Sequence, residues 1–438
     1  MTRTNRRGGT LLALTAAAIA MTSIEAQAGG FAIREQSAEG LGAAFAGIAA
    51  GTNDLSSMFW NPATLSLHDG SSVQGEIAAI LPYANIDVDS STRPTGVPGA
   101  FVNNGTEESG NLGSLAIVPS TYVAHQVNDK LRVGLAINSP FGLVNEANRG
   151  WAGNFHGLKS DLFSININPM ASYDLSDYLS VGVGVQVQYV DVALTQENLV
   201  GLNTFAQGRA TGDDWGYGVT AGVVFKPTEY TRVGLGYRSQ IKHSIRGHSE
   251  VSTSGTGAPG TLTNLGKLTA RTTLPEMVSL GVRHMVNEDW TVMGTVEWTN
   301  WSRFKELRIE NDSGAPDNVT EEDWNDGWFF SVGAEHKWDE KLTLRGGVAY
   351  EISPVPDRTR TPRIPDNDRI WLNVGGSYQV SSNLSFSVAY SHIFVEDGPI
   401  NLSRNDVGNA ARGDLVGESK ANVDIIAVSL KYDFGRLP

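Results

Sequence analysis

The stretch VGVGVQVQY, at residues 181–189, places valine or tyrosine at every second position and glycine or glutamine between them. The stretch LTLRGGVAY, at residues 342–350, has the same spacing. A period of two puts one class of side chain on each face of a β-strand. With 49 Gly and only 18% charged residues, the composition also favours a β-rich chain over a helical or disordered one.

The alternating pattern recurs from about residue 71 to the end of the chain. It predicts fourteen strands, an even number, near residues 71–87, 110–127, 130–140, 161–173, 178–195, 213–227, 230–250, 267–286, 289–311, 326–338, 341–352, 368–380, 383–396 and 419–434.

The connections between these strands alternate in length. Asn128-Asp129 and Ser381-Ser382 are tight turns, whereas residues 196–212 and 251–266 are expected to be longer polar loops. Short turns on one side and long loops on the other are typical of barrels in the outer membrane. A soluble sandwich or propeller also alternates apolar and polar residues, but it does not predict this asymmetry. We therefore expect an all-β fold, a 14-stranded antiparallel transmembrane β-barrel spanning residues 71–438.

Residues 1–28 have the pattern of a secretory signal. Arg3, Arg6 and Arg7 precede an apolar run at residues 11–21, and residues 26–28 read Ala-Gln-Ala, a cleavage signature. A run of eleven is too short for a membrane-spanning helix, which needs about 20 apolar residues. We therefore predict export, and the barrel pattern indicates the outer membrane of a Gram-negative bacterium.

The composition argues against several function classes. The chain has no Cys, so disulfides and thiolate chemistry are excluded, and its formal net charge of -14 disfavours nucleic acid as a partner. No phosphate loop, HExxH motif or aligned Ser, His and acid set occurs in the sequence. We expect no cofactor, no metal site and no enzymatic activity.

Strand parity assigns charged residues to the interior of the barrel, because a cation at the lipid midplane costs about 2 to 4 kcal/mol. Most of these charges are expected to be paired within the wall, and one or two remain free to meet an anionic head group. The residues assigned to the interior are Arg132, Arg232, Arg238, Gln240, Lys242, Arg246, Arg283, Glu297, Glu335, Arg345, Glu351, Arg369 and Asp424.

Residues 29–70 do not alternate. They combine glycines with many apolar residues, among them Phe31, Ile33 and Trp60, and contain the motif Asn61-Pro62-Ala63. Because the segment is too apolar for an unfolded leader, we expect it to fold into the barrel as a plug, or hatch.

Several ordered blocks resemble a known family. They are GGF at 29–31, SAEGLGAAFAG at 37–47, NPA at 61–63, SPFGL at 139–143, WGYGVTAGVVF at 215–225, VGLGYRSQIK at 233–242, LPEMVSLG at 274–281, WTNWSRF at 298–304 and SPVPDRTRTPRIPDNDRIW at 353–371. In these blocks the chain is similar to outer-membrane long-chain fatty-acid transporters, a family that includes channels for aromatic hydrocarbons.

The resemblance implies energy-independent uptake of long-chain fatty acids or similar hydrophobic compounds. Hatch movement would release the ligand sideways through a gap at strand 3, and the candidate gap is Asn138, Ser139, Pro140, Phe141 and Gly142. Pro140 cannot donate to a ladder, which fits an inward kink at this point; the alternative is that Pro140 simply ends the strand. The implied partners are a hydrophobic small molecule, outer-membrane lipids and the barrel-assembly machinery.

Phe31 and Ile33 are the candidate hatch residues that touch ligand. Lumen parity adds Arg238, Lys242 and Arg369 as candidate partners of a carboxylate. Two other functions stay open on the sequence alone: a channel for aromatic or alkane hydrocarbons, which needs no such cations, and a non-transporting surface barrel used for adhesion.

Overall fold

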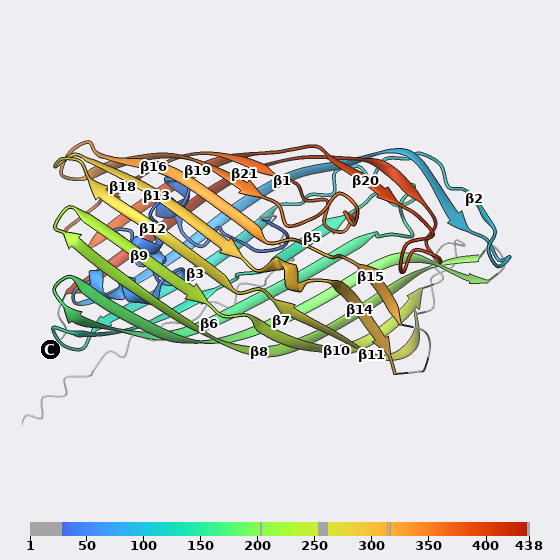
Figure 1. The fold of residues 1–438 in the computed structure, drawn as a ribbon, viewed down its shortest axis with the longest axis horizontal. Coiled ribbons are helices and arrows are strands. Elements are labelled where there is room, and N and C mark those ends of the chain that lie inside the picture. The colour runs from blue at the N-terminus through green and yellow to red at the C-terminus, as the bar shows by residue number, and fades with distance from the viewer. Residues whose placement is uncertain (1–28, 202–203, 253–261, 313, 315–316, 436–438) are drawn as a thin grey trace, which may run out of the picture.

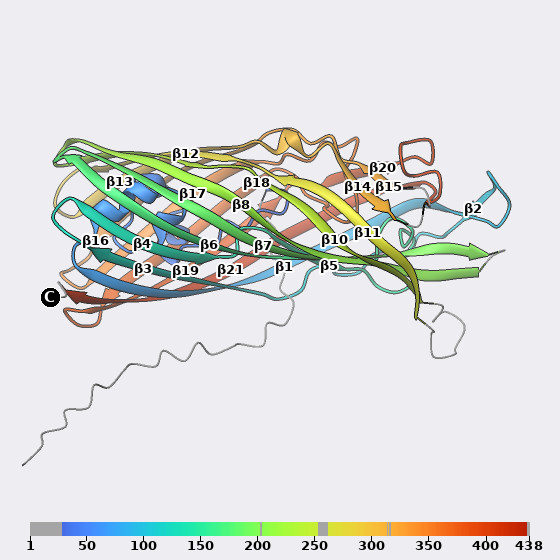
Figure 2. The same ribbon diagram turned by 90° about the horizontal axis from the view of Figure 1, so that it is seen from below.

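The alternating stretches form one antiparallel sheet that closes on itself, because the first wall strand, β1 (Ser71–Pro94), pairs along its length with the last, β21 (Leu415–Gly435). The computed structural model describes residues 29–201, 204–252, 262–312, 314 and 317–435, so the predicted signal at residues 1–28 lies outside the described part. Figures 1 and 2 show the resulting long, tilted barrel from two sides.

The wall has the fourteen strands expected, several of them interrupted once. Six wall strands consist of two labelled pieces each: β4 with β5, β9 with β10, β11 with β12, β13 with β14, β15 with β16 and β19 with β20. The words strand 1 to strand 14 count the wall strands in chain order, so strand 3 is β4 with β5, strand 7 is β9 with β10, strand 8 is β11 with β12 and strand 9 is β13 with β14. The remaining strand, β2, is a short one in the first outer loop. The bounds are β2 Phe101–Asn103, β3 Ala116–Gln126, β4 Leu131–Asn138, β5 Gly142–Glu146, β6 Lys159–Ser176, β7 Leu179–Gly201, β8 Thr204–Thr228, β9 Thr231–Arg238, β10 Ile241–Ser252, β11 Leu262–Leu274, β12 Met277–Met285, β13 Trp290–Thr299, β14 Glu306–Asn311, β15 Asn318–Glu321, β16 Gly327–Lys337, β17 Leu342–Ile352, β18 Arg369–Gln379, β19 Leu384–Val395 and β20 Gly398–Leu402.

The outer face of the wall is apolar and the inner face is polar or small. On β7, Val183 and Val185 are 63% and 51% exposed, whereas Gln186 and Gln188 are buried in the lumen. The chain was expected to form a loop at residues 196–212, but β7 and β8 continue as a hairpin to Gly201 and from Thr204. The alternation ends there because both faces of that hairpin lie beyond the lipid. No helix in the described part of the chain is long and apolar enough to cross a membrane.

Three of the interior assignments are wrong. The interruption of strand 7 at Ser239 and Gln240 inverts the alternation, so Ile241 faces the lumen and Lys242 and Arg246 are exposed on the outer face. Asp424 also points outward, with 41% of its side chain exposed. Its neighbours Val423 and Ile425 are buried because they pack on the hatch, which makes both faces of β21 apolar at this point.

Residues 29–70, called the hatch here, lie inside one end of the barrel (Figures 1 and 2, dark blue). They form α1 (Ala38–Gly42) and the short 3₁₀ helices η1 (Ile48–Ala50), η2 (Ser56–Phe59) and η3 (Pro62–Leu67). A further 3₁₀ turn, η5 (Trp301–Arg303), interrupts strand 9. The apolar side chains of the hatch join those of the inner wall in one buried cluster, which includes Leu41, Phe45 and Trp60.

Wall glycines let the hatch backbone approach the sheet closely. A Cβ atom placed on Gly234 would lie 1.8 Å from the carbonyl oxygen of Ala49, and one on Gly236 would lie 2.0 Å from that of Trp60. Neither contact leaves space for a side chain, because the opposing atoms belong to the backbone. These inward-facing glycines therefore form a surface, called the glycine seat below, on which the hatch backbone packs. A residue with a side chain would not fit at either position.

We predict that Gly234→Val dislodges this part of the hatch. Overpacking costs about 1 to 3 kcal/mol, and a clash with backbone lies at the upper end of that range. The mutant barrel should lose resistance to heating in SDS, measured as the temperature at which its gel mobility changes. The control is Gly75→Val, because Gly75 lies on β1 with no atom within 4 Å of its Cβ position. Equal stability of the two variants would contradict the seat.

Candidate ligand passage through the barrel

The first residues of the hatch, 29–36, form an arm that pairs with strand 3 where that strand is interrupted. Ile33 N donates to Pro140 O over 2.8 Å, and Gly142 N donates to Phe31 O over 3.0 Å. Ala32 and Phe141 form an antiparallel bridge between these two bonds. The predicted segment 138–142 is thus the part of strand 3 that pairs with the arm of the hatch.

The wall ladder is incomplete at the same place. β3 pairs with β4 only as far as Thr121 and Ile137, and β5 pairs with β6. Within the described part of the chain, no pairing joins β5 to β3, so Ala116–Ser120 pairs on its β1 side alone. Pro140 has no N–H to extend the ladder. The structure therefore has a gap in the wall at this height.

The side chain of Gln36 bridges the two edges of the gap. Its Nε2 donates to Ser139 O over 2.8 Å, and its Oε1 accepts from Ser120 Oγ at 2.8 Å and from Asn138 Nδ2 at 3.2 Å. The hydroxyl of Tyr122 donates to the carbonyl of Gln36. One hatch residue thus supplies hydrogen bonds that the missing ladder cannot. The sequence analysis did not identify Gln36, because no motif or alternating pattern around it indicates a contact with strand 3.

Ion pairs hold the arm on its other side. Arg34 Nη1 lies 2.6 Å from Glu297 Oε1, and Gly29 N donates to Glu351 Oε1 over 3.1 Å. Gly30 N donates to Asp366 Oδ2 over 2.8 Å. Glu35, by contrast, is buried with neither carboxylate oxygen hydrogen-bonded to another described side chain, and burial raises its pKa to about 7.

Two small cavities lie beside the arm. The upper one, about 100 Å³ and on the side of the outer loops, is lined mainly by apolar residues of strands 3 to 9, among them Phe31, Leu162 and Ile245. The lower one, about 60 Å³, has a mixed lining that contains Ile33 and Phe141 as well as Arg34, Arg238, Glu297 and Glu351. Of the two hatch residues predicted to touch ligand, Phe31 therefore lines the upper cavity and Ile33 the lower one.

The ring of Phe31 is enclosed by other aromatic rings. Its centroid lies 4.7 Å from Trp301, 5.8 Å from Phe304, 5.8 Å from Trp324 and 6.1 Å from Phe141. Edge-to-face pairs of this kind add about 0.5 to 1.5 kcal/mol each beyond their burial. Phe31 is therefore packed between the aromatic residues Trp301, Phe304 and Trp324 and Phe141 of strand 3.

Two buried arginines lie at the outer end of the upper cavity. Arg363 lines both this cavity and a second one of about 150 Å³ nearer the outer loops, which Arg412 also lines. The hydrogen-bond acceptors of Arg363 are all neutral: Lys159 O, Ser160 Oγ, Thr195 O and Gln196 Oε1, at 3.1 to 3.2 Å. Burial and the charge of Arg412 lower the pKa of Arg363 to about 9, so the guanidinium is still charged at pH 7. The buried acid Glu322 lines the same cavity, and burial raises the pKa of its carboxyl to about 8, so it is mostly protonated at pH 7. An anion that enters here therefore meets two buried cations next to a largely neutral acid.

The three predicted carboxylate partners occupy different environments. Arg238 lines the lower cavity, where it donates to Phe59 O over 2.8 Å and to Gln186 Oε1 over 2.5 Å. Arg369 forms a buried ion pair with Asp366. Lys242 lies on the outer face, for the reason given above, and cannot meet a ligand in the lumen.

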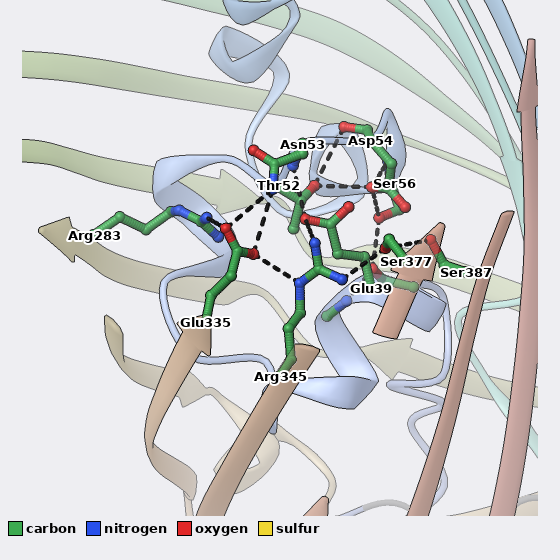
Figure 3. Close-up of polar contacts among 12 residues, drawn as sticks. Glu39, Thr52, Asn53, Asp54, Ser56, Arg283, Glu335, Arg345, Ser377 and Ser387 are labelled. Carbon is green, nitrogen blue, oxygen red and sulfur yellow. Dashed lines mark hydrogen bonds and ion pairs between the residues drawn. The ribbon is translucent and has the colours of Figure 1, made fainter. Parts of the chain in front are cut away.

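Polar contacts also fasten the body of the hatch to the wall (Figure 3). Glu39 lies 3.1 Å from Arg345, which also contacts Glu335 at 2.7 Å, and Glu335 contacts Arg283 at 3.2 Å. Asn53 Nδ2 donates to both oxygens of Glu335 over 3.3 Å. This network joins hatch residues to β12, β16 and β17 and faces a polar cavity of about 530 Å³ at the end of the barrel that holds the hatch.

The motif Asn61-Pro62-Ala63 also anchors the hatch body. Asn61 Nδ2 donates to Ala49 O over 2.7 Å and to Val223 O of the wall over 2.9 Å. Asn61 Oδ1 accepts from Ala63 N and so caps η3, in which Pro62 occupies the first position. The motif therefore fixes a helix start against strand β8.

We predict that Gln36→Ala loosens the arm at the gap. Buried groups left without partners cost about 1 to 3 kcal/mol each, so amide exchange at Ile33 and Gly142 should accelerate by about tenfold or more. Hydrogen exchange in detergent measures this directly. The control is Gln74→Ala, which removes a bond to Leu55 in the hatch body and should leave both amides unchanged. Unaltered exchange in the Gln36 variant would contradict its bridging role.

Comparison with known proteins gives a consistent result. The model of a family described as outer membrane protein transport protein (OMPP1/FadL/TodX) matches residues 19–434. A long-chain fatty acid transport protein of Escherichia coli O6:H1 is 30% identical over 411 residues, with 86% of this chain and 90% of that protein covered. A 47 kDa outer membrane protein of Pasteurella multocida is 30% identical over 469 residues, with 99% and 100% covered.

Solved structures share the fold. A Pseudomonas aeruginosa FadL homologue superposes with a TM-score of 0.83 at 24% identity, covering 92% of this chain and 100% of that one. The toluene transporter TodX of P. putida gives a TM-score of 0.71 at 17% identity, covering 92% and 99%.

Proposed function

Because the chain belongs to the outer membrane transport protein family of OMPP1, FadL and TodX, we propose that it carries long-chain fatty acids inward along the two cavities and releases them sideways. Transport of long-chain fatty acids or other hydrophobic compounds across the outer membrane is common to this family. The proposal adds the substrate and the route. The ligand enters at Arg363, passes Phe31, and leaves through the gap between β3 and β5 once the arm withdraws.

The observation that carries the choice of a fatty acid is the position of Arg363. A charged guanidinium with neutral partners lies at the rim of an apolar cavity, so a carboxylate and an acyl chain both find their complement. Burial of each CH₂ is worth roughly 0.8 kcal/mol, which gives a long chain on the order of ten kcal/mol before the costs of association. This free energy is large enough to displace Phe31 and the arm.

An uncharged hydrocarbon is the second candidate substrate. The lining of the upper cavity favours it, because most of the side chains between Phe31 and Arg363 are apolar. Such a ligand would gain binding free energy from contact with the apolar cavity walls, and none from the guanidinium of Arg363. The two substrates therefore differ in their dependence on one residue.

We predict that Arg363→Gln lowers oleate uptake about tenfold or more and leaves toluene uptake unchanged, since hydrogen bonds to a charged group contribute about 1.5 to 3 kcal/mol. Uptake of both radiolabelled compounds by cells that express the variant measures the difference. Arg363→Lys should restore part of the oleate uptake. The control Arg358→Gln removes an exposed cation from the same loop, paired with Glu321 and Asp323. An equal loss for both substrates would overturn the carboxylate role.

Withdrawal of the arm can be tested with a disulfide. The chain has no Cys, so Ala32→Cys with Phe141→Cys creates a single pair at a bridge position. Antiparallel neighbours have Cα atoms about 4.5 to 5.5 Å apart, within the range that a disulfide spans. Uptake should stop in the oxidised protein and return after reduction, while each single variant stays active. Continued uptake by the fully crosslinked protein would exclude release past the arm.

A further inference from the structure

The outer face of β10 and β11 carries four cations and no acid over residues 242–248 and 267–273. They are Lys242 and Arg246 on β10 and Lys267 and Arg271 on β11, all exposed. These four residues are called the cationic patch below. The patch lies on the outer face, apart from the passage through the lumen, so its role does not depend on which substrate the barrel carries.

Strand register brings the four cations together. Ser244 lies opposite Arg271, Arg246 opposite Thr269, and His248 opposite Lys267. On one face of an antiparallel pair, opposite residues are about 5 Å apart and diagonal ones about 7 to 8 Å. Arg271 is therefore diagonal to both β10 cations, and Lys267 is diagonal to Arg246. Figures 1 and 2 show β10 and β11 side by side in the half of the barrel away from the hatch.

The charge of the patch is only partly compensated. Arg271 pairs with Glu310 of β14 at 2.5 Å, and Asp213 of β8 lies opposite Arg246 in the register. Four cations and these two acids leave a net charge of +2. Within the described residues, Lys242, Arg246 and Lys267 have no carboxylate within 4.0 Å of their cationic nitrogens. The whole chain, in contrast, carries a formal net charge of -14.

Outward-facing aromatic residues place the patch near the height of the lipid head groups. It begins just beyond Tyr237 on β9, and Trp215 and Tyr217 are exposed on β8, the strand that pairs with β10. Outward-facing aromatic rings flank the hydrocarbon of the membrane in barrels of this class. Exposed cations elsewhere in the outer half of the barrel, such as Lys305, Arg308 and Lys420, are paired with acids, unlike three of the four patch cations.

We propose that the cationic patch binds the phosphate groups of a phosphorylated glycolipid in the outer leaflet, of the lipid A type. Two phosphates on one sugar head group match cations spread over two strands and about 14 Å of β10. Each cation near a lipid surface attracts anionic head groups, and arginine also forms forked hydrogen bonds to phosphate.

The test uses the purified full-length barrel in detergent, with lipid A binding measured by native mass spectrometry. The variant Lys242→Gln, Arg246→Gln, Lys267→Gln should bind bisphosphorylated lipid A at least tenfold more weakly. Its matched control, Lys159→Gln, Lys305→Gln, Arg358→Gln, removes three exposed cations that are paired with acids and should bind like the unmodified protein. Substitutions at exposed positions leave the barrel folded, and heat-dependent gel mobility verifies this for both variants.

Three outcomes would overturn the proposal. Dephosphorylated lipid A that binds as tightly as the bisphosphorylated form would exclude phosphate recognition. An equal loss in the control variant would assign binding to total charge, and equal affinity for phosphatidylglycerol vesicles would exclude a glycolipid site. A tenfold loss confined to the patch variant and to phosphorylated lipid A would support it.

Discussion

Backbone N–H and C=O groups have no water to bond with inside a bilayer, and this constraint explains why the barrel and its hatch form one unit. Several wall strands are interrupted, and at strand 3, where Pro140 breaks the ladder, the described residues show no pairing between β5 and β3. The arm supplies the missing partners through Ile33, Phe31 and the amide of Gln36. The contacts that seal the wall are therefore the same contacts that any sideways release must break.

Much of the fold could be predicted from the sequence, because alternation survives wherever one face of a strand meets lipid. The fourteen strands, the tight turns and the burial of residues 29–70 follow from that pattern. Strand alternation assigned side chains to the wrong face at two places. The interruption at Ser239 and Gln240 exchanged the two faces of strand 7 and turned Lys242 outward. At Asp424, an apolar hatch behind the wall made the inner face as hydrophobic as the outer one.

The residues that line the cavities were harder to predict from the sequence, because some of them lie in loops that have no alternating pattern. Phe31 and Ile33 could be named because an apolar segment ahead of the first strand has to pack somewhere, and each lines a cavity. Arg363 lies in the connection between β17 and β18, where no periodicity relates a side chain to the lumen. Only the folded loop brings it over the upper cavity. The nearby Pro362 and Pro365 indicate a rigid backbone, but they do not indicate which way the Arg363 side chain points.

The glycine seat also constrains the order in which the molecule folds. The hatch precedes β1 in the chain, yet it packs on strands from β1 round to β21, and the seam between β1 and β21 closes the ring. Some of its native contacts therefore join residues hundreds of positions apart, which is the kind of topology that folds slowly. The hatch completes these contacts only when the last strands are in place, so its apolar side chains need shelter until then.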